Sequence, residues 1–318
     1  MVEGATGQPG ARTSRRRGLG YYVAGFAVFA GFIGFVEYYI GWTRLLAPWS
    51  GLSPVQTGAA LALIFLSYIV RSLRLFSYLR LHRLHDFALC LKVMLQHNLL
   101  NNLLPMRTGE ASFPLLLKRY FGLPLVSSLP VLLWFRLLDM HTLVTLALAA
   151  VGSDILPGKV GWLLLLLWNA VPYAAFRGAG SLGRKLGDGS SPGRAARLLA
   201  RLLSALPATS RGFWLSWCWT LFNWVIKLGA FAWALQFFID IPLRVALLGA
   251  VGGDLTSVLP VHSVAGMGTY EGGIVAALLP FGVDADHALA AAVNLHLLLL
   301  AATLVSGLLS LLIPGRNA

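Results

Sequence analysis

The sequence predicts an all-α membrane protein, a polytopic transmembrane helical bundle with about six full spans and two opposed re-entrant helical segments. Its 318 residues are 57% hydrophobic and 12% charged, with a mean hydropathy of +0.73. A soluble domain would leave too much of this apolar surface in contact with water. Apolar stretches long enough to cross ~30 Å of hydrocarbon recur along the chain. Two further apolar stretches are broken by proline, glycine and ionisable residues.

Six stretches are predicted to cross the membrane completely. In order they are Tyr21–Ile40, Gln56–Val70, Pro124–Val151, Gly161–Phe176, Phe213–Ile239 and His287–Ile313. The second and fourth are shorter than the others but still long enough to be plausible spans. Basic residues precede Tyr21–Ile40, as in a signal peptide, but this stretch is too long for an h-region and lacks a small-residue cleavage pattern. We therefore expect it to remain as the first span.

The orientation of the spans follows from the distribution of Lys and Arg. Four arginines precede the first span and four follow the second, and cytoplasmic loops carry such an excess. These residues are Arg12, Arg15, Arg16, Arg17, Arg71, Arg74, Arg80 and Arg83. We expect both termini in the cytoplasm and the protein in the cell's inner (cytoplasmic) membrane. The net charge of +13 then reflects topology rather than nucleic-acid binding, since no nucleic-acid motif accompanies it.

The chain is expected to form one transmembrane domain over residues 21–318, after a disordered basic tail at residues 1–20. Its first half covers about residues 21–176 and its second half residues 212–318. A basic cytoplasmic loop, residues 177–211, connects them. Near Gly193–Leu206 this loop has the pattern of a basic amphipathic helix on the membrane surface, although a solvated basic loop fits as well.

The two broken segments share one order of features. Each runs from an apolar helix through a Leu-Pro break and a Gly-rich polar stretch to a Glu, and ends about ten residues later at Phe-Gly. Leu104–Glu110 is the break of the first segment and Leu259–Glu271 that of the second. The first is flanked by basic residues and the second by acidic ones, so we expect them to enter from opposite faces. Unless the likeness arose by chance, this is the pattern of an inverted-repeat transporter with its site near the midplane.

Ionisable and amide residues at these breaks and in the spans are the candidate substrate-binding residues. They are Asn101, Asn102, Arg107, Glu110, Arg136, Asp139, His262 and Glu271. A break in lipid frees backbone groups that protein or cavity water must satisfy, and a charge at the bilayer centre costs about 2.5–3.5 kcal/mol on insertion scales. Alternatives stay open: the glutamates are also suited to capping helices, and Arg136 with Asp139 to a neutralising pair. Lys227 would either snorkel or pair with Glu271 or Asp254.

Known catalytic signatures are absent from the sequence. It contains no Walker A motif, no G-x-S-x-G elbow and no H-E-x-x-H pair. The histidines lack metal-ligand spacing, so we assign no metal and no cofactor. The two cysteines, Cys90 and Cys218, lie far apart in apolar stretches and indicate no disulfide framework.

Three ordered blocks resemble the flippase-like transmembrane region of lysylphosphatidylglycerol synthases, which also exists as stand-alone membrane proteins. Residues 101–110 read Asn-Asn-Leu-Leu-Pro-Met-Arg-Thr-Gly-Glu, Arg136 to Asp139 form an Arg-x-x-Asp, and a Pro…Gly-x-Gly-x-x-Glu pattern ends at Glu271. The resemblance runs from about Arg71 to the last span. The chain departs from the family at Phe113 and His296, where an Arg is frequent. The family's soluble aminoacyl-transferase domain is missing from the sequence.

The resemblance implies translocation, without modification, of a lipid or lipid-linked molecule with a polar, phosphate-bearing headgroup. In this hypothesis Arg107 and Arg136 hold the headgroup, while Glu110 and Glu271 balance charge or couple protons. One alternative is an intramembrane enzyme that uses Glu110, Glu271 or His262 as acid or base. The other is a non-catalytic membrane partner of a lipid- or glycan-synthesis enzyme, docked through the basic loop. Membrane lipids with anionic headgroups are the expected partners.

Overall fold

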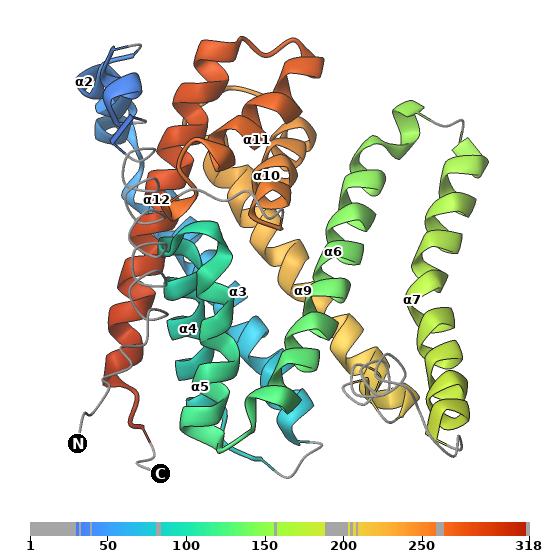
Figure 1. The fold of residues 1–318 in the computed structure, drawn as a ribbon. Coiled ribbons are helices and arrows are strands. Elements are labelled where there is room, and N and C mark those ends of the chain that lie inside the picture. Colours follow the sequence, from blue (N-terminus) through green and yellow to red (C-terminus); the bar gives the residue numbers. More distant parts are fainter. Residues whose placement is uncertain are drawn as a thin grey trace, which may run out of the picture.

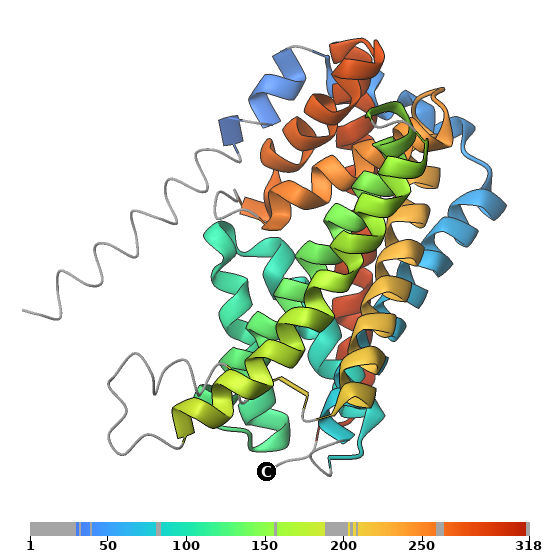
Figure 2. The same ribbon diagram turned by 90° about the vertical axis from the view of Figure 1, so that its right-hand side faces the viewer.

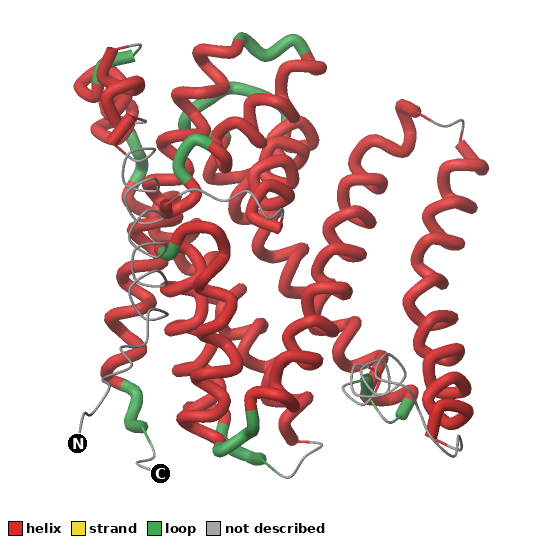
Figure 3. The backbone as a smooth tube through the Cα atoms, viewed as in Figure 1, coloured by secondary structure: helices red, strands yellow, loops and turns green. Residues whose placement is uncertain are grey.

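The computed structural model describes residues 30–31, 33–38, 40–80, 84–155, 158–187, 203, 206–207, 209–258 and 264–315. Every regular element within these ranges is a helix (Figures 1 and 3). In chain order they are α2 (Trp42–Leu46), η1 (Ala47–Gly51), α3 (Pro54–Arg80), α4 (Phe87–Leu103), η2 (Pro105–Ala111), α5 (Ser112–Phe121), α6 (Leu125–Ile155), α7 (Gly158–Gly187), α9 (Ser210–Leu235), α10 (Leu243–Val258), η3 (Val264–Gly266), α11 (Thr269–Leu278), η4 (Leu279–Phe281) and α12 (Ala285–Leu312).

Five helices in the described ranges are long and apolar enough to cross a membrane: α3, α6, α7, α9 and α12. They confirm five of the six predicted spans, and most of the sixth, Tyr21–Ile40, lies outside the described residues. One boundary was wrong. The second span does not end at Val70, because α3 continues to Arg80 and carries Arg71 and Arg74 inside the helix rather than in a loop.

The two broken segments form helical hairpins that point toward each other. One consists of α4, η2 and α5, and the other of α10, η3 and α11; they approach the middle of the molecule from opposite ends (Figures 1 and 2). Their tips meet there, with η3 in contact with both η2 and α4. Since α5 and α11 have 10 residues each, each returning arm is about 15 Å long, roughly half the hydrocarbon thickness. The prediction of opposed broken segments is confirmed.

Glycine allows the arms of both hairpins to pack closely. A Cβ at Gly109 in η2 would collide with the backbone of Leu100 and Asn101 in α4. In the other hairpin Gly252 of α10 and Gly273 of α11 lie against each other, and a Cβ on either would collide with the other's carbonyl oxygen. Small residues permit this backbone approach between membrane helices. The second tip also needs left-handed backbone, with a φ of 53° at Ala265.

The two halves of the bundle have the same order of elements. The first contains α3, the α4–α5 hairpin and α6, and the second contains α9, the α10–α11 hairpin and α12. Contacts between the halves follow the same symmetry: α3 packs on α9, the hairpin arm α4 packs on α12, and the hairpin arm α10 packs on α6. Helix α7 connects the halves at the edge of the bundle (Figure 1). This arrangement brings polar residues of both halves to the centre.

Candidate functional site

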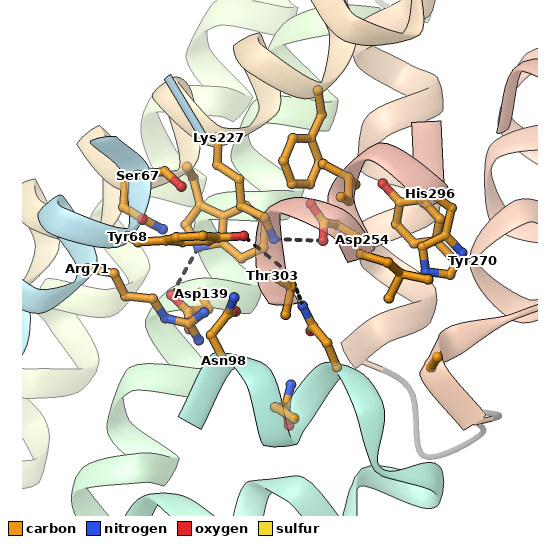
Figure 4. A pocket seen from close by; sticks show the side chains of 18 of the residues that line it. Ser67, Tyr68, Arg71, Asn98, Asp139, Lys227, Asp254, Tyr270, His296 and Thr303 are labelled. Atoms are coloured by element: carbon orange, nitrogen blue, oxygen red, sulfur yellow. Dashed lines mark hydrogen bonds and ion pairs between the residues drawn. The ribbon is translucent and has the colours of Figure 1, made fainter. Parts of the chain in front are cut away.

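A polar cavity lies between the hairpins and the long helices, with a volume of about 90 Å³. Side chains from α3, α4, α6, α9, α10, α11 and α12 line it (Figure 4). A space of this size holds several water molecules. Such a cavity supplies the solvation that broken helices and buried charges need within a membrane. It is the natural candidate for the functional site.

Asp139 of α6 lies at the centre of a cluster of guanidinium groups. Its carboxylate accepts hydrogen bonds from Arg74 Nη1 at 2.6 Å and from Trp224 Nε1 at 3.0 Å. Arg136 Nη1 lies 3.8 Å from the same carboxylate, and Arg71 is close enough to interact with it electrostatically. Arg74 and Asp139 are both only 2% exposed. A buried pair of this kind is tolerated because each charge compensates the other.

Lys227 of α9 forms the corresponding charged contact in the second half of the chain. Its ammonium donates to Asp254 Oδ1 of α10 at 2.8 Å and lies 4.6 Å from the centroid of a Trp224 ring. Because Trp224 also donates to Asp139, the charged groups of the two halves are joined through one indole ring. This contact settles the choice left open by the sequence, since Lys227 pairs with Asp254.

Each hairpin carries a glutamate that binds a cationic or titratable side chain of the following long helix. Glu110 in η2 lies 3.2 Å from Arg136 of α6, and Glu271 in α11 lies 2.6 Å from Nδ1 of His296 in α12. The two pairs have nearly the same sequence separation and equivalent positions in the two halves. Glu271 also accepts the backbone N–H of Gly268 at 2.7 Å, so it caps α11 as well.

Uncharged polar groups complete the lining of the cavity. Asn102 of α4 donates to Thr303 Oγ1 of α12 at 3.0 Å, a hydrogen bond that joins the first hairpin to the last helix. Asn98 is 7% exposed, and its amide nitrogen has no hydrogen-bond partner among the described residues. The same holds for Oδ1 of Asn101. Buried polar groups of this kind are normally satisfied, and here both side chains line the cavity.

The structure brings most of the predicted site residues together. Asn101, Asn102, Arg136 and Asp139 line the cavity directly. Glu110 reaches it through Arg136, and Glu271 reaches it through the lining residue His296. Arg107 lies in η2 with a side chain outside the described part of the structure, and His262 lies outside it altogether.

The sequence did not predict several residues of the site, among them Arg71, which lines the cavity, and Arg74, which binds the lining residue Asp139. Arg71 and Arg74 were read as loop residues because a charge ended the apolar window. The apolar pattern nevertheless continues through Leu75, Phe76 and Leu79, and this continuation was the available signal for a longer helix with inward-facing arginines. His296 was not among the predicted site residues.

The fold and the site define a polytopic helical membrane protein whose two similar halves enclose a charged central cavity. The family model of the lysylphosphatidylglycerol synthase TM region matches residues 22–307, and the chain belongs to this family. No curated protein and no solved structure matches the chain.

Proposed function

We propose that this protein moves a lipid or lipid-linked molecule with a polar, phosphate-bearing headgroup between the two leaflets of the membrane. The observation that carries the proposal is the meeting of two opposed hairpin tips beside a charged cavity lined by both halves of the chain. Opposed broken helices with a site at their junction are the architecture of alternating access. The headgroup would occupy the cavity while the acyl chains stay in lipid.

An apolar groove beside the cavity supports this proposal. It has a volume of about 550 Å³ and is lined mainly by leucines of α4, α5 and α12, among them Leu99, Leu103 and Leu304. Asn102 and Thr303, each adjacent in sequence to one of these leucines, hydrogen-bond across the wall between groove and cavity. A lipid with its chain in the groove would therefore place its headgroup at this hydrogen bond. Opening of the α4–α12 contact is the proposed route into the cavity.

Charges at the two ends of the bundle support the expected orientation. Arg80 ends α3, and Lys118 and Arg119 lie in the last turn of α5, at the end of the bundle where the first hairpin opens. Asp284 and Asp286 begin α12, at the end where the second hairpin opens. The positive-inside rule places the basic end in the cytoplasm. We propose this orientation in the inner membrane.

The test is leaflet exchange of a fluorescent phospholipid by the purified protein in liposomes. Glu110→Gln and Glu271→Gln should each abolish exchange without unfolding the protein, because each removes the carboxylate that binds Arg136 or His296. Glu37→Gln, a change of the same chemistry at an exposed position, is the matched control and should leave exchange intact. Normal exchange by both hairpin variants would rule out the proposed role of the hairpin glutamates.

Two other outcomes would point to the alternative functions. Chemical conversion of a lipid by the purified protein alone would identify an enzyme. Loss of cellular function on neutralising the basic stretch of residues 177–211, with both hairpin glutamates dispensable, would instead identify a membrane partner of a synthase.

A further inference from the structure

One position that carries a carboxylate in the second half of the chain carries a neutral amide in the first. Lys227 of α9 and Asp254 of α10 are 27 residues apart and form an ion pair. Arg71 of α3 and Asn98 of α4 have the same separation of 27 residues and occupy the equivalent helices of the first half. The cation is thus present in both halves, while the carboxylate of the second half is replaced by a neutral amide in the first.

Other carboxylates near Arg71 are already paired. Asp139 is bound by Arg74 at 2.6 Å and lies 3.8 Å from Arg136, and Glu110 lies 3.2 Å from Arg136. Among the side chains that the structure describes, three guanidinium groups, those of Arg71, Arg74 and Arg136, therefore share two carboxylates in this cluster. One positive charge is left over. Arg71 forms no salt bridge with any residue in the described part of the chain.

Two hydrogen-bond donors without partners lie at the surplus charge. Nε of Arg71 and Nδ2 of Asn98 have no acceptor among the described residues, and both side chains line the polar cavity. Figure 4 shows Arg71 and Asn98 pointing toward the region of Asp139. An uncompensated cation in a low-dielectric site is costly. A ligand that brings one negative charge and several acceptor oxygens would satisfy both the charge and the donors.

We propose that Arg71, assisted by Asn98, binds a singly charged oxyanion, the phosphodiester group of a lipid headgroup. Arg136 then acts mainly through its pairs with Glu110 and Asp139, rather than as the headgroup cation. This inference rests on the proposed lipid transport for the source of the anion. The binding site itself follows from the charges of the cavity.

Equilibrium binding to the full-length protein in dodecyl maltoside, an uncharged detergent, tests the proposal. The probe is a short-chain fluorescent phosphatidylglycerol, and binding is read from energy transfer from tryptophan, since Trp224 lines the cavity. A diacylglycerol with the same fluorophore lacks the phosphodiester. We expect saturable binding of the phospholipid and none of the diacylglycerol. Equal binding of the two would overturn the proposal.

Two variants remove the surplus charge in different ways. Arg71→Gln deletes the cation and should weaken phospholipid binding at least ~tenfold, the range for a charged hydrogen bond. Asn98→Asp instead installs the carboxylate that Asp254 provides in the second half, and should weaken binding as much while preserving the fold, since it adds an ion pair. It keeps the test valid if Arg71→Gln fails to fold. Unchanged binding by a folded Asn98→Asp variant would refute the role of Arg71.

Comparison variants distinguish the effect of the Arg71 charge on binding from the effect of removing any other charge. Lys118→Gln removes one exposed positive charge at the end of α5 and should leave binding within about twofold of the unmodified protein. The double variant Glu110→Gln/Arg136→Gln removes no net charge and should weaken binding less than Arg71→Gln does. A larger loss in the double variant would assign the anion to Arg136 instead and overturn the proposal.

Competition identifies the source of the anion. If only unlabelled short-chain phosphatidylglycerol displaces the probe, the anion belongs to a lipid headgroup. If inorganic phosphate displaces the probe as well, and the Arg71→Gln variant abolishes that displacement, the same oxyanion site binds a free ion. Displacement by neither would overturn the site. The outcome is independent of leaflet exchange. Binding of the phospholipid without leaflet exchange would contradict the proposed transport alone. Leaflet exchange together with unchanged phospholipid binding by the Arg71→Gln variant would contradict this inference alone.

Discussion

Replacing Asp139 with Asn removes the carboxylate shared by the guanidinium cluster. The change leaves Arg74, 2% exposed, without its counter-charge, since Arg74 Nη1 and Nη2 lie 2.6 and 3.4 Å from the Asp139 oxygens. Removing one partner of a buried ion pair costs about 3–5 kcal/mol. At about 1.4 kcal/mol per tenfold, the unfolding equilibrium constant should rise by roughly two to four orders of magnitude.

Equilibrium unfolding in mixed micelles, titrated with sodium dodecyl sulfate and followed by circular dichroism, measures this loss. Asp284→Asn is the matched control: Asp284 is exposed and caps α12, a position at which Asn is as good as Asp. The double variant Arg74→Met/Asp139→Leu should recover most of the stability, because replacing a buried pair by apolar residues of similar volume is often near neutral. A loss below about 1 kcal/mol for Asp139→Asn, or no recovery in the double variant, would refute the charge-pairing argument.

Two further predictions concern the hairpins. Gly273→Ala would place a Cβ 2.5 Å from the Gly252 oxygen and should destabilise the protein by about 1–3 kcal/mol in the same unfolding assay. Gly272→Ala, whose Cβ meets nothing within 4 Å, should be neutral or stabilising, and equal losses would contradict the close-packing argument. Cysteines at positions 102 and 303, which replace the Asn102–Thr303 hydrogen bond of 3.0 Å, should form a disulfide that blocks lipid exchange until it is reduced. Undiminished exchange by the crosslinked protein would place the lipid's entrance elsewhere.

The broken helices were predictable because local chemistry produces them. A Leu-Pro step followed by glycine and a charged residue ends a helix whatever surrounds it, and this pattern at Leu104–Glu110 and Leu259–Glu271 was enough to locate both breaks. The flanking charges correctly indicated that the two segments oppose each other. The helix breaks and the flanking charges both depend only on residues that are close together in the sequence.

The pairing of Asp139 with Arg74 was not predictable, since it depends on contacts between distant helices. Arg74 and Asp139 are separated by 65 residues, and nothing local to either residue indicates the other. A neutralising pair of Arg136 with Asp139 at i+3 was one of the alternatives, yet the shorter contact of Arg136 is with Glu110 and that of Asp139 is with Arg74. Helical spacing shows which residues share a face, but the tertiary packing selects the partner.

Helix α7 has a consequence for the topology of the whole protein. None of its membrane-spanning window is buried within the protein, and its main contact is with α6. Its single crossing nevertheless determines the direction in which the second half runs. Because α7 lies between α6 and α9 in the chain, α9 starts at the end of the bundle where α3 finishes and runs antiparallel to α3 (Figure 1). Removing one crossing would make the two halves parallel, and their hairpins would then enter from the same face. An apolar helix long enough to cross the membrane once is all that this reversal requires.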